Sequence, residues 1–332
     1  MSMDKAVAVV GATGAVGVEL LQTLERRDFP VKSLRLLASS RSAGKDMTYR
    51  GENVPVEVLD ERAFAGVDIA LFAAGGGVSQ RFAPLAADAG AVVIDNSSTF
   101  RMDPQVPLIV PEINVSALAD HQGIVANPNC STIILAMVLK PLHLVGSLRR
   151  VVVSTYQSAS GGGQRAMDEM FEMSRAALGG RPYDAEVLPH SLAFNLYPQV
   201  DIFMDSGYTR EEDKMLFESR KILGLPELAV DVTCVRVPVA RCHSEAVTIE
   251  FEKLVTPELA REVLAAFPGV QVQDDPGAES FPQPVSVTGR DDVVVGRIRQ
   301  SRTFDPGLTL WVVGDQLLKG AALNAVQIAE HL

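Results

Sequence analysis

A glycine-rich turn between an apolar run and a helical segment constrains the fold of this chain most strongly. Residues 6–10 are uninterruptedly apolar, as expected for a strand buried on both faces of a sheet. Gly11, Gly14 and Gly17 follow, and residues 18–25 then show the apolar spacing of a helix. Such glycines let the backbone approach a pyrophosphate at the helix N-terminus. The spacing departs from the commoner Gly-x-Gly-x-x-Gly, so a plain strand–helix turn is the alternative.

The first half of the chain alternates apolar runs with helix-like stretches, which is typical of a parallel sheet with crossover helices. The apolar runs are residues 34–38, 54–59, 69–73 and 92–95, and a helix-like stretch covers 82–89. We predict an α/β fold with a doubly wound, Rossmann-type parallel sheet over residues 1–130.

The second half has a different character, because strands there outnumber helices and several follow one another directly. Strands are predicted at residues 151–156, 230–237, 246–251, 293–299 and 309–313, and helices at 164–178, 210–223 and 257–266. We expect a second, α+β domain with a mixed or antiparallel sheet over residues 131–315. A final amphipathic helix over residues 316–332 is expected to pack back on the first domain.

Composition excludes several classes of function. The net charge of −11 argues against nucleic-acid binding, which needs clustered cations. The apolar run at 133–139 is far shorter than the roughly 20 residues that span a bilayer. The N-terminus is expected to carry no leader peptide, because a strand follows almost at once. Three widely spaced cysteines suggest neither a disulfide framework nor a metal site, and they favour the cytoplasm.

Cys130 is the candidate nucleophile. Pro128 interrupts the preceding structure, and Ser131 and Thr132 lead into the apolar run as the first turn of a buried helix. A sulfur at a helix N-terminus meets unpaired backbone N–H groups and the positive end of the dipole, and both favour the thiolate. The alternative is that Cys130 is simply a small buried hydrophobic residue.

The residues after the second predicted strand favour NADP over NAD. An NAD site would place an acidic residue there, whereas this chain has a run of hydroxyl groups and a cation that suit a 2′-phosphate. These residues are Ser39, Ser40, Arg41 and Ser42. A second glycine cluster that includes Gly75 follows another strand and could also approach a cofactor.

Further polar residues are candidates for ligand binding or proton transfer, although each has an ordinary structural alternative. Arg101, in a hydroxyl-rich loop, could bind phosphate or carboxylate. His243 is suited to proton transfer near neutral pH, but a lone histidine is often only structural. Glu218 and Lys221, three residues apart, share a helix face and could equally form a solvated ion pair.

Taken together, the motifs resemble those of the aspartate-semialdehyde dehydrogenases over nearly the whole chain, and their order and spacing are more specific than any one of them. The segments are residues 11–17, Asn96-Ser97-Ser98 with Arg101-Met102, Pro128-Asn129-Cys130-Ser131-Thr132, Tyr156-Gln157, Arg236-Val237-Pro238 and His243-Ser244-Glu245.

The resemblance implies a mechanism. Cys130 would attack the aldehyde, hydride would pass to NADP, and phosphate would release the resulting thioester as L-aspartyl 4-phosphate; biosynthesis of lysine through diaminopimelate, of threonine and of methionine uses the reverse direction. His243 would be the general acid and base, and Gln157 would orient the substrate.

The resemblance also assigns binding roles, with no metal, and implies a homodimer or a dimer of dimers. Arg101, Lys221 and Asn129 would hold phosphate, Arg236 the α-carboxylate, and Glu218 the α-ammonium group. The implied cofactor-binding residues are Gly11, Thr13, Gly14, Ala15, Val16, Gly17, Ser39, Ser40, Arg41, Ser42, Gly75, Ser97, Gly161 and Asn324.

Two other functions remain open from the sequence. A reductase of N-acetyl-γ-glutamyl phosphate would share the cysteine and histidine, but its acylated amine would leave Glu218 without a cationic partner. A non-catalytic NADP-sensing protein would leave the pairing of Cys130 with His243 unexplained.

Overall fold

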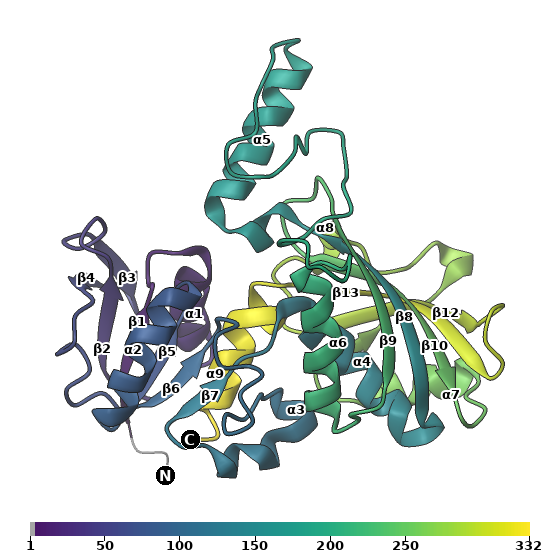
Figure 1. Ribbon diagram of the computed structural model, residues 1–332, viewed down its shortest axis with the longest axis horizontal. Coiled ribbons are helices and arrows are strands. Elements are labelled where there is room, and N and C mark those ends of the chain that lie inside the picture. The colour runs from purple at the N-terminus through teal and green to yellow at the C-terminus, as the bar shows by residue number, and fades with distance from the viewer. Residues whose placement is uncertain (1–3) are drawn as a thin grey trace. The chain divides into compact units, whose positions relative to one another are not determined.

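The chain divides into two compact units. The computed structural model describes residues 4–332; residues 1–3, which begin the segment expected to carry no leader peptide, lie outside the described part. The first unit combines the chain up to Asn129 with Ala321–Leu332, and the second is Cys130–Gly320 (Figure 1).

The described part of the first unit contains a seven-stranded sheet in the order β3-β4-β2-β1-β5-β6-β7. Every neighbouring pair is parallel except β3 with β4, which form an antiparallel hairpin at one edge. The strands are β1 (Lys5–Val10), β2 (Val31–Ala38), β3 (Asp46–Tyr49), β4 (Glu52–Val58), β5 (Ile69–Phe72), β6 (Val92–Asp95) and β7 (Ile124–Ala126).

Helices cover both faces of this sheet, which explains the continuous apolar run of β1. Val7 and Val9 point to the face that packs on Leu20 of α1 and Ala325 of α9, while the alternate residues of β1 pack toward α2. The C-terminal helix α9 is therefore part of the core of the first unit (Figure 1). The helices are α1 (Ala15–Arg26), α2 (Gly76–Asp88), α3 (Pro111–Asn114), the 3₁₀ turn η1 (Val115–Asp120) and α9 (Leu323–Ala329).

The second unit is built on a mixed sheet. Within residues 130–320, six strands lie in the order β11-β12-β13-β10-β8-β9. The outer pairs β8–β9 and β11–β12 are parallel, and the inner pairs are antiparallel. The strands are β8 (Leu148–Gln157), β9 (Ala229–Arg236), β10 (His243–Phe251), β11 (Val270–Val272), β12 (Val293–Gln300) and β13 (Gly307–Gly314).

Helices α4 and α6 pack on one face of this second sheet (Figure 1). Residues 133–139 of α4 are completely buried, because α4 lies between the sheet and its neighbouring helices. The helix α5 and the segment after it form an extension with a small apolar core of their own, which includes Met170 and Leu192. The second unit contains the helices α4 (Cys130–Gly146), η2 (Ala159–Gly162), α5 (Gln164–Leu178), α6 (Arg210–Leu223), α7 (Pro257–Ala265), η3 (Pro276–Ala278) and α8 (Pro284–Val287).

The fold confirms the predicted α/β class with its second, mixed-sheet domain. The predicted bounds of α5 and α6 agree with the structure, while the short strands β3, β7 and β11 were missed. The final helix predicted over residues 316–332 is present only in part, at residues 318–329, and it is not α-helical throughout. A π-helical turn (η4, Leu318–Ala322) precedes α9, and Gly320 within it lies close to the start of α4.

Two kinds of feature are absent from the described residues. No helix among residues 4–332 is both long enough and apolar enough to cross a membrane. The same residues contain no group of three or more histidine, cysteine, aspartate or glutamate side chains arranged to hold a metal ion.

Candidate functional site

Cys130 is the first residue of α4 and is partly exposed. Its position places the sulfur at the positive end of the helix dipole, which favours a thiolate. Gly320 packs closely behind it, since a Cβ atom at position 320 would lie 2.9 Å from the Cβ of Cys130. The π-helical turn therefore supports the start of α4 and leaves no room for a side chain at that point.

The other two cysteines are poor nucleophiles. Cys234 and Cys242 are fully buried, and burial raises the pKa of both thiols, to about 12 for Cys242 and further for Cys234. A thiol with so high a pKa is almost entirely protonated near neutral pH. Cys130 is thus the cysteine available for covalent chemistry.

Strand register brings three predicted site residues to one edge of the second sheet. Gln157 and Arg236 are the last residues of the parallel neighbours β8 and β9, and they pair directly. His243 opens β10, which runs antiparallel to β8, and the next residue, Ser244, pairs with Tyr156. The end of β8, the end of β9 and the start of β10 therefore meet at this edge, which brings Gln157 to Arg236 and His243 from a distant part of the sequence.

The start of α4 packs on the same region. His243 pairs with Gly314 of β13, and a Cβ atom at position 314 would lie 2.7 Å from Cγ1 of Ile134. Ile134 is one helical turn after Cys130. Cys130 and His243 are consequently held in the same part of the second unit by this close packing of helix on strand.

His243 is held neutral in a defined tautomer. Its Nδ1 accepts a hydrogen bond from the Ser158 backbone N–H over 3.1 Å, so the ring proton resides on Nε2. Burial and the nearby Arg236 guanidinium lower the pKa of His243 to about 3. Nε2 is buried and has no hydrogen-bond partner among the described residues, so it remains available to a ligand.

Gly161 lies against the His243 ring. A Cβ atom at position 161 would be 3.0 Å from Cε1 and 3.1 Å from Nε2 of His243. Any side chain at this position would compete for the space beside Nε2. The structure therefore places Gly161, which was predicted to contact the cofactor, next to the candidate proton-transfer residue.

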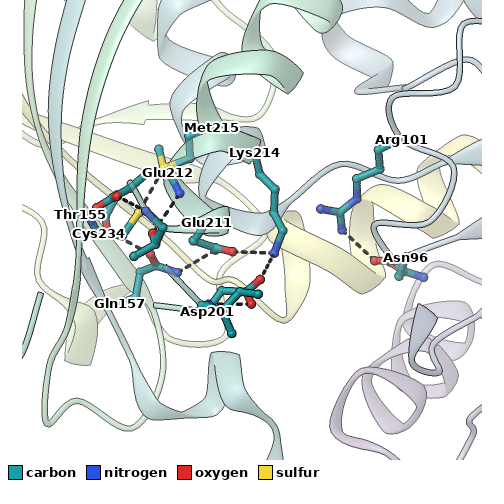
Figure 2. Close-up of polar contacts among 12 residues, drawn as sticks. Asn96, Arg101, Thr155, Gln157, Asp201, Glu211, Glu212, Lys214, Met215 and Cys234 are labelled. Carbon is teal, nitrogen blue, oxygen red and sulfur yellow. Dashed lines mark hydrogen bonds and ion pairs between the residues drawn. The ribbon is translucent and has the colours of Figure 1, made fainter. Parts of the chain in front are cut away.

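The first turn of α6 contributes two charged residues that the sequence analysis did not single out, Glu211 and Lys214. The Gln157 amide donates to Glu211 Oε1 over 3.1 Å, and Lys214 Nζ donates to Glu211 Oε2 over 3.0 Å (Figure 2). Gln157 Oε1 in turn accepts from the Thr155 hydroxyl over 3.0 Å. These bonds fix the Gln157 amide and attach it to an ion pair.

The start of α6 is fixed by the sequence around it. Thr209 and Glu212 form a reciprocal capping box, and Glu212 also accepts from the Cys234 backbone N–H over 2.9 Å. The cap thus anchors the helix to β9, and Glu211 and Lys214 follow from it. Glu218 is buried two turns beyond Glu211, roughly 10 Å further along the axis, and Lys221 lies in the last turn of α6.

Arg236 is a buried guanidinium near the His243 ring. Its Nη1 donates to the Ser158 carbonyl over 2.6 Å. The Ser158 backbone therefore orients both side chains, Arg236 through its carbonyl and His243 through its N–H. The rest of the planar guanidinium retains N–H groups of the kind that bind a carboxylate.

Arg101 and Asn129 belong to the first unit and are both buried. Arg101 donates to the backbone carbonyl of Asn127 over 2.9 Å. It also donates to the backbone carbonyl of Asn96 over 2.8 Å (Figure 2). These bonds hold the guanidinium in one orientation within the loop that follows β6.

The glycine turn after β1 has the geometry of a backbone cradle. Gly11 adopts a φ of +82°, and a Cβ atom there would lie 2.7 Å from the Ala73 carbonyl oxygen. Gly17 is equally crowded, since its Cβ would lie 2.6 Å from the Ala12 carbonyl oxygen. Gly14 is the N-cap of α1 and supplies no side-chain cap, which leaves the first N–H groups of the helix for an anion.

The remaining predicted cofactor residues lie in several environments. The Thr13 hydroxyl, in the glycine turn, is 3.3 Å from the Ser42 hydroxyl, so the turn and the polar loop after β2 are in contact. Gly75 is the N-cap of α2, and Ser97 is bonded to the buried Asp95 carboxylate. Asn324 donates to Ile109 O and Asn127 Oδ1, so both of its amide hydrogens are used within the first unit.

The first unit has a dinucleotide-binding fold, and the unit that follows it in the chain has a cysteine at a helix N-terminus. These two features are typical of one class of enzymes, the dehydrogenases that use a thiol covalently. Family profiles match both units, the semialdehyde dehydrogenase NAD binding domain over residues 6–121 and the semialdehyde dehydrogenase dimerisation domain over residues 139–319. The chain belongs to the aspartate-semialdehyde dehydrogenase family of enzymes.

The relatives match along nearly their whole length. The chain is 52% identical to aspartate-semialdehyde dehydrogenase of Synechocystis over 326 residues, which covers 98% of this chain and 96% of the relative. Identity to the enzyme of Aquifex aeolicus is 51% over 334 residues, covering 99% and 98%. The crystal structure of aspartate semialdehyde dehydrogenase II from Vibrio cholerae, complexed with ASA, superposes with a TM-score of 0.97 at 45% identity, covering 100% and 98% of the two chains.

Proposed function

We propose that the chain catalyses the reversible, NADP-dependent reductive dephosphorylation of L-aspartyl 4-phosphate to L-aspartate 4-semialdehyde through a thioester on Cys130. Such a reaction would serve biosynthesis of the aspartate-family amino acids. The observation that carries the proposal is the position of Cys130 at the start of α4, packed on the sheet edge where Gln157, Arg236 and His243 meet.

In the oxidative direction the Cys130 thiolate attacks the aldehyde carbon, and the carbonyl electron pair moves to oxygen. His243 Nε2, whose proton has no other acceptor among the described residues, donates a hydrogen bond to that oxygen and stabilises its negative charge. The oxygen electron pair re-forms the carbonyl as hydride leaves the carbon, which gives the thioester. NADP, when bound, accepts the hydride. A phosphate oxygen then attacks the thioester carbon, the carbon–sulfur bond breaks, and the thiolate returns to Cys130. Gln157, fixed by Thr155 and Glu211, orients the substrate beside the thiol.

Charge complementarity supports a substrate that carries both an amine and an acid. Arg236 is the proposed partner of the α-carboxylate. For the α-ammonium and phosphate we prefer Glu211 and Lys214 to Glu218 and Lys221, because the first pair is bonded to Gln157 at the sheet edge. Arg101 and Asn129 remain proposed phosphate ligands from the first unit.

The glycine turn fits a dinucleotide, because Gly11 and Gly17 let neighbouring backbone segments pack closely around the start of α1, whose first N–H groups can face a pyrophosphate. The hydroxyl groups of Ser39, Ser40 and Ser42 with the exposed Arg41 fit a 2′-phosphate, which favours NADP over NAD. Gly14, Ala15 and Val16 form the helix start toward the pyrophosphate, and Gly75, Ser97, Gly161 and Asn324 are retained as proposed contacts.

The proposal includes assembly and location. The match of residues 139–319 to a dimerisation domain supports a homodimer, or a dimer of such dimers. A nucleophilic thiol such as Cys130 remains reduced in the cytoplasm, which is the location we propose.

The test is NADPH formation from L-aspartate 4-semialdehyde with and without inorganic phosphate. We expect turnover that requires phosphate, because phosphate is the acceptor of the acyl group. Activity with N-acetylglutamate 5-semialdehyde and none with aspartate semialdehyde would overturn the substrate assignment. Turnover that continues at the same steady rate without phosphate would overturn acyl transfer to phosphate.

A further inference from the structure

Lys214 is held by two carboxylates at once. Its ammonium nitrogen lies 2.8 Å from Asp201 Oδ2 and 3.0 Å from Glu211 Oε2 (Figure 2). The exposed fractions of the side chains are 18% for Lys214, 26% for Asp201 and 7% for Glu211. Burial lowers the pKa of Lys214, but the two carboxylates outweigh this effect and raise it above its ordinary value. The group is therefore one cation between two anions.

The Asp201 carboxylate is placed by the backbone around it. Asp201 has a φ of +67°, a left-handed conformation that aspartate tolerates better than most residues, and its Oδ1 accepts the Ile202 N–H over 2.9 Å. The Ile202 carbonyl accepts from the Arg210 N–H over 2.9 Å, and Phe203 forms a bridge with Thr209. These contacts attach the loop to the first residue of α6. The loop therefore holds the Asp201 carboxylate facing Lys214.

Glu211 also contacts the sheet edge, because its other oxygen accepts a hydrogen bond from the Gln157 amide. Among residues 4–332, the Asp201 carboxylate makes no such bond to the sheet edge. A lysine has three N–H donors and no acceptor, so an anion that approaches Lys214 can use the donor that the carboxylates leave. A phosphate there would lie within a few ångströms of Asp201, whose charge has the same sign and whose partial burial limits screening by solvent.

We propose that Asp201 is a positioning residue that competes with phosphate for the Lys214 ammonium and thereby sets the affinity for phosphate. This inference rests on the proposed function of Lys214 as a phosphate ligand. Removing the Asp201 charge leaves Lys214 and Glu211 in place, so the variant gains affinity for the anion. If the ion pair were purely structural, we would expect the opposite result. Its loss would then loosen the loop and weaken the binding of phosphate and of aspartate semialdehyde together.

The experiment measures KM for phosphate, KM for aspartate semialdehyde and kcat in Asp201→Asn, with Asp205→Asn as the matched control. Asp205 is an exposed aspartate of the same loop and takes no part in the lysine pair. We expect the phosphate KM to fall about three-fold in Asp201→Asn, in line with a partly exposed pair. We expect kcat and the aspartate-semialdehyde KM to change much less, and the control to match the wild type.

A phosphate KM that is unchanged or raised in folded Asp201→Asn would overturn the inference. Thermal unfolding reports whether the variant is folded, and Asp201→Gly serves if it is not, because glycine adopts the same positive φ without a carboxylate. Lys214→Met distinguishes the proposed role of Lys214 from that of Asp201. If it leaves the phosphate KM unchanged, the proposed role of Lys214 is wrong. If it raises that KM while both Asp201 variants leave it unchanged, only the role of Asp201 is wrong.

Discussion

The Gln157 amide donates a 3.1 Å hydrogen bond to the Glu211 carboxylate, which joins the end of β8 to the first turn of α6. The two residues are separated by 54 positions in the sequence. The bond gives the candidate site a carboxylate at the sheet edge, where a substrate ammonium would need one.

Glu211→Gln should raise the KM for aspartate semialdehyde about ten-fold or more, because a charged hydrogen bond to the substrate ammonium is worth about 1.5–3 kcal/mol. Glu218→Gln, on the same helix, is the matched control and should leave that KM near its wild-type value. Steady-state kinetics of both variants with saturating phosphate decide the matter. The reverse result would restore the original expectation that Glu218 binds the ammonium.

Cys130 should be the first thiol alkylated in the native protein, because Cys234 and Cys242 are buried and the pKa of each is raised. Brief treatment with iodoacetamide followed by peptide mass spectrometry identifies the labelled residue. Cys130→Ala should lose both rapid labelling and turnover while it still binds NADP. Turnover by folded Cys130→Ala would exclude covalent catalysis at this residue.

Acid should destabilise the fold partly through His243. The folded-state pKa of about 3 lies below the ordinary value of 6.5, so the unfolded chain binds a proton that the folded chain does not between these values. The corresponding stability is present above about pH 6.5 and is lost as the pH falls toward 3.

Urea unfolding at pH 7.5 and 4.5 measures that loss. His243→Gln should lose less stability between the two values than the wild type, whereas His331→Gln, at an exposed position, should behave as the wild type. The same His243 variant should lower kcat by about 10²–10³-fold, because it removes the imidazole donor to the developing oxyanion. Equal loss of stability in all three proteins would contradict a buried neutral histidine.

Glu245 should destabilise the fold increasingly as the pH rises. It is completely buried on β10, neither carboxyl oxygen has a hydrogen-bond partner among the described residues, and burial raises its pKa well above 4.5. Above pH 4.5 the unfolded chain releases a proton that the folded chain retains, so stability falls with pH up to the folded-state pKa. The cost is about 1.4 kcal/mol for each pKa unit.

Glu245→Gln removes the ionisable group while it keeps the shape of the neutral acid. Its free energy of unfolding should therefore change less than that of the wild type between pH 5 and 8, as followed by urea denaturation. Glu227→Gln, at an exposed glutamate, is the control. A wild-type pH profile in Glu245→Gln would show that Glu245 is ionised in the folded protein.

Local sequence signals determined much of this protein. The apolar run before Gly11 predicted a strand buried on both faces, and the packing of α1 and α9 on one face and α2 on the other explains why. The residues around Cys130 predicted a helix start, and α4 begins there. The bounds of α5 and α6 were also readable, since periodicity and caps act within a few residues of the chain.

Tertiary structure alone decided which charges meet. Helix α6 carries Glu-x-x-Lys twice, at Glu211 with Lys214 and at Glu218 with Lys221, and spacing cannot choose between them. The choice depends on which turn of the helix reaches the end of β8, and the cap at Thr209 and the bond from Cys234 to Glu212 fix that turn. Asp201 meets Lys214 through a loop whose geometry depends on bridges to α6. Periodicity is a property of neighbouring residues, whereas the pairing of distant side chains follows from strand register and helix docking, which only the folded chain establishes.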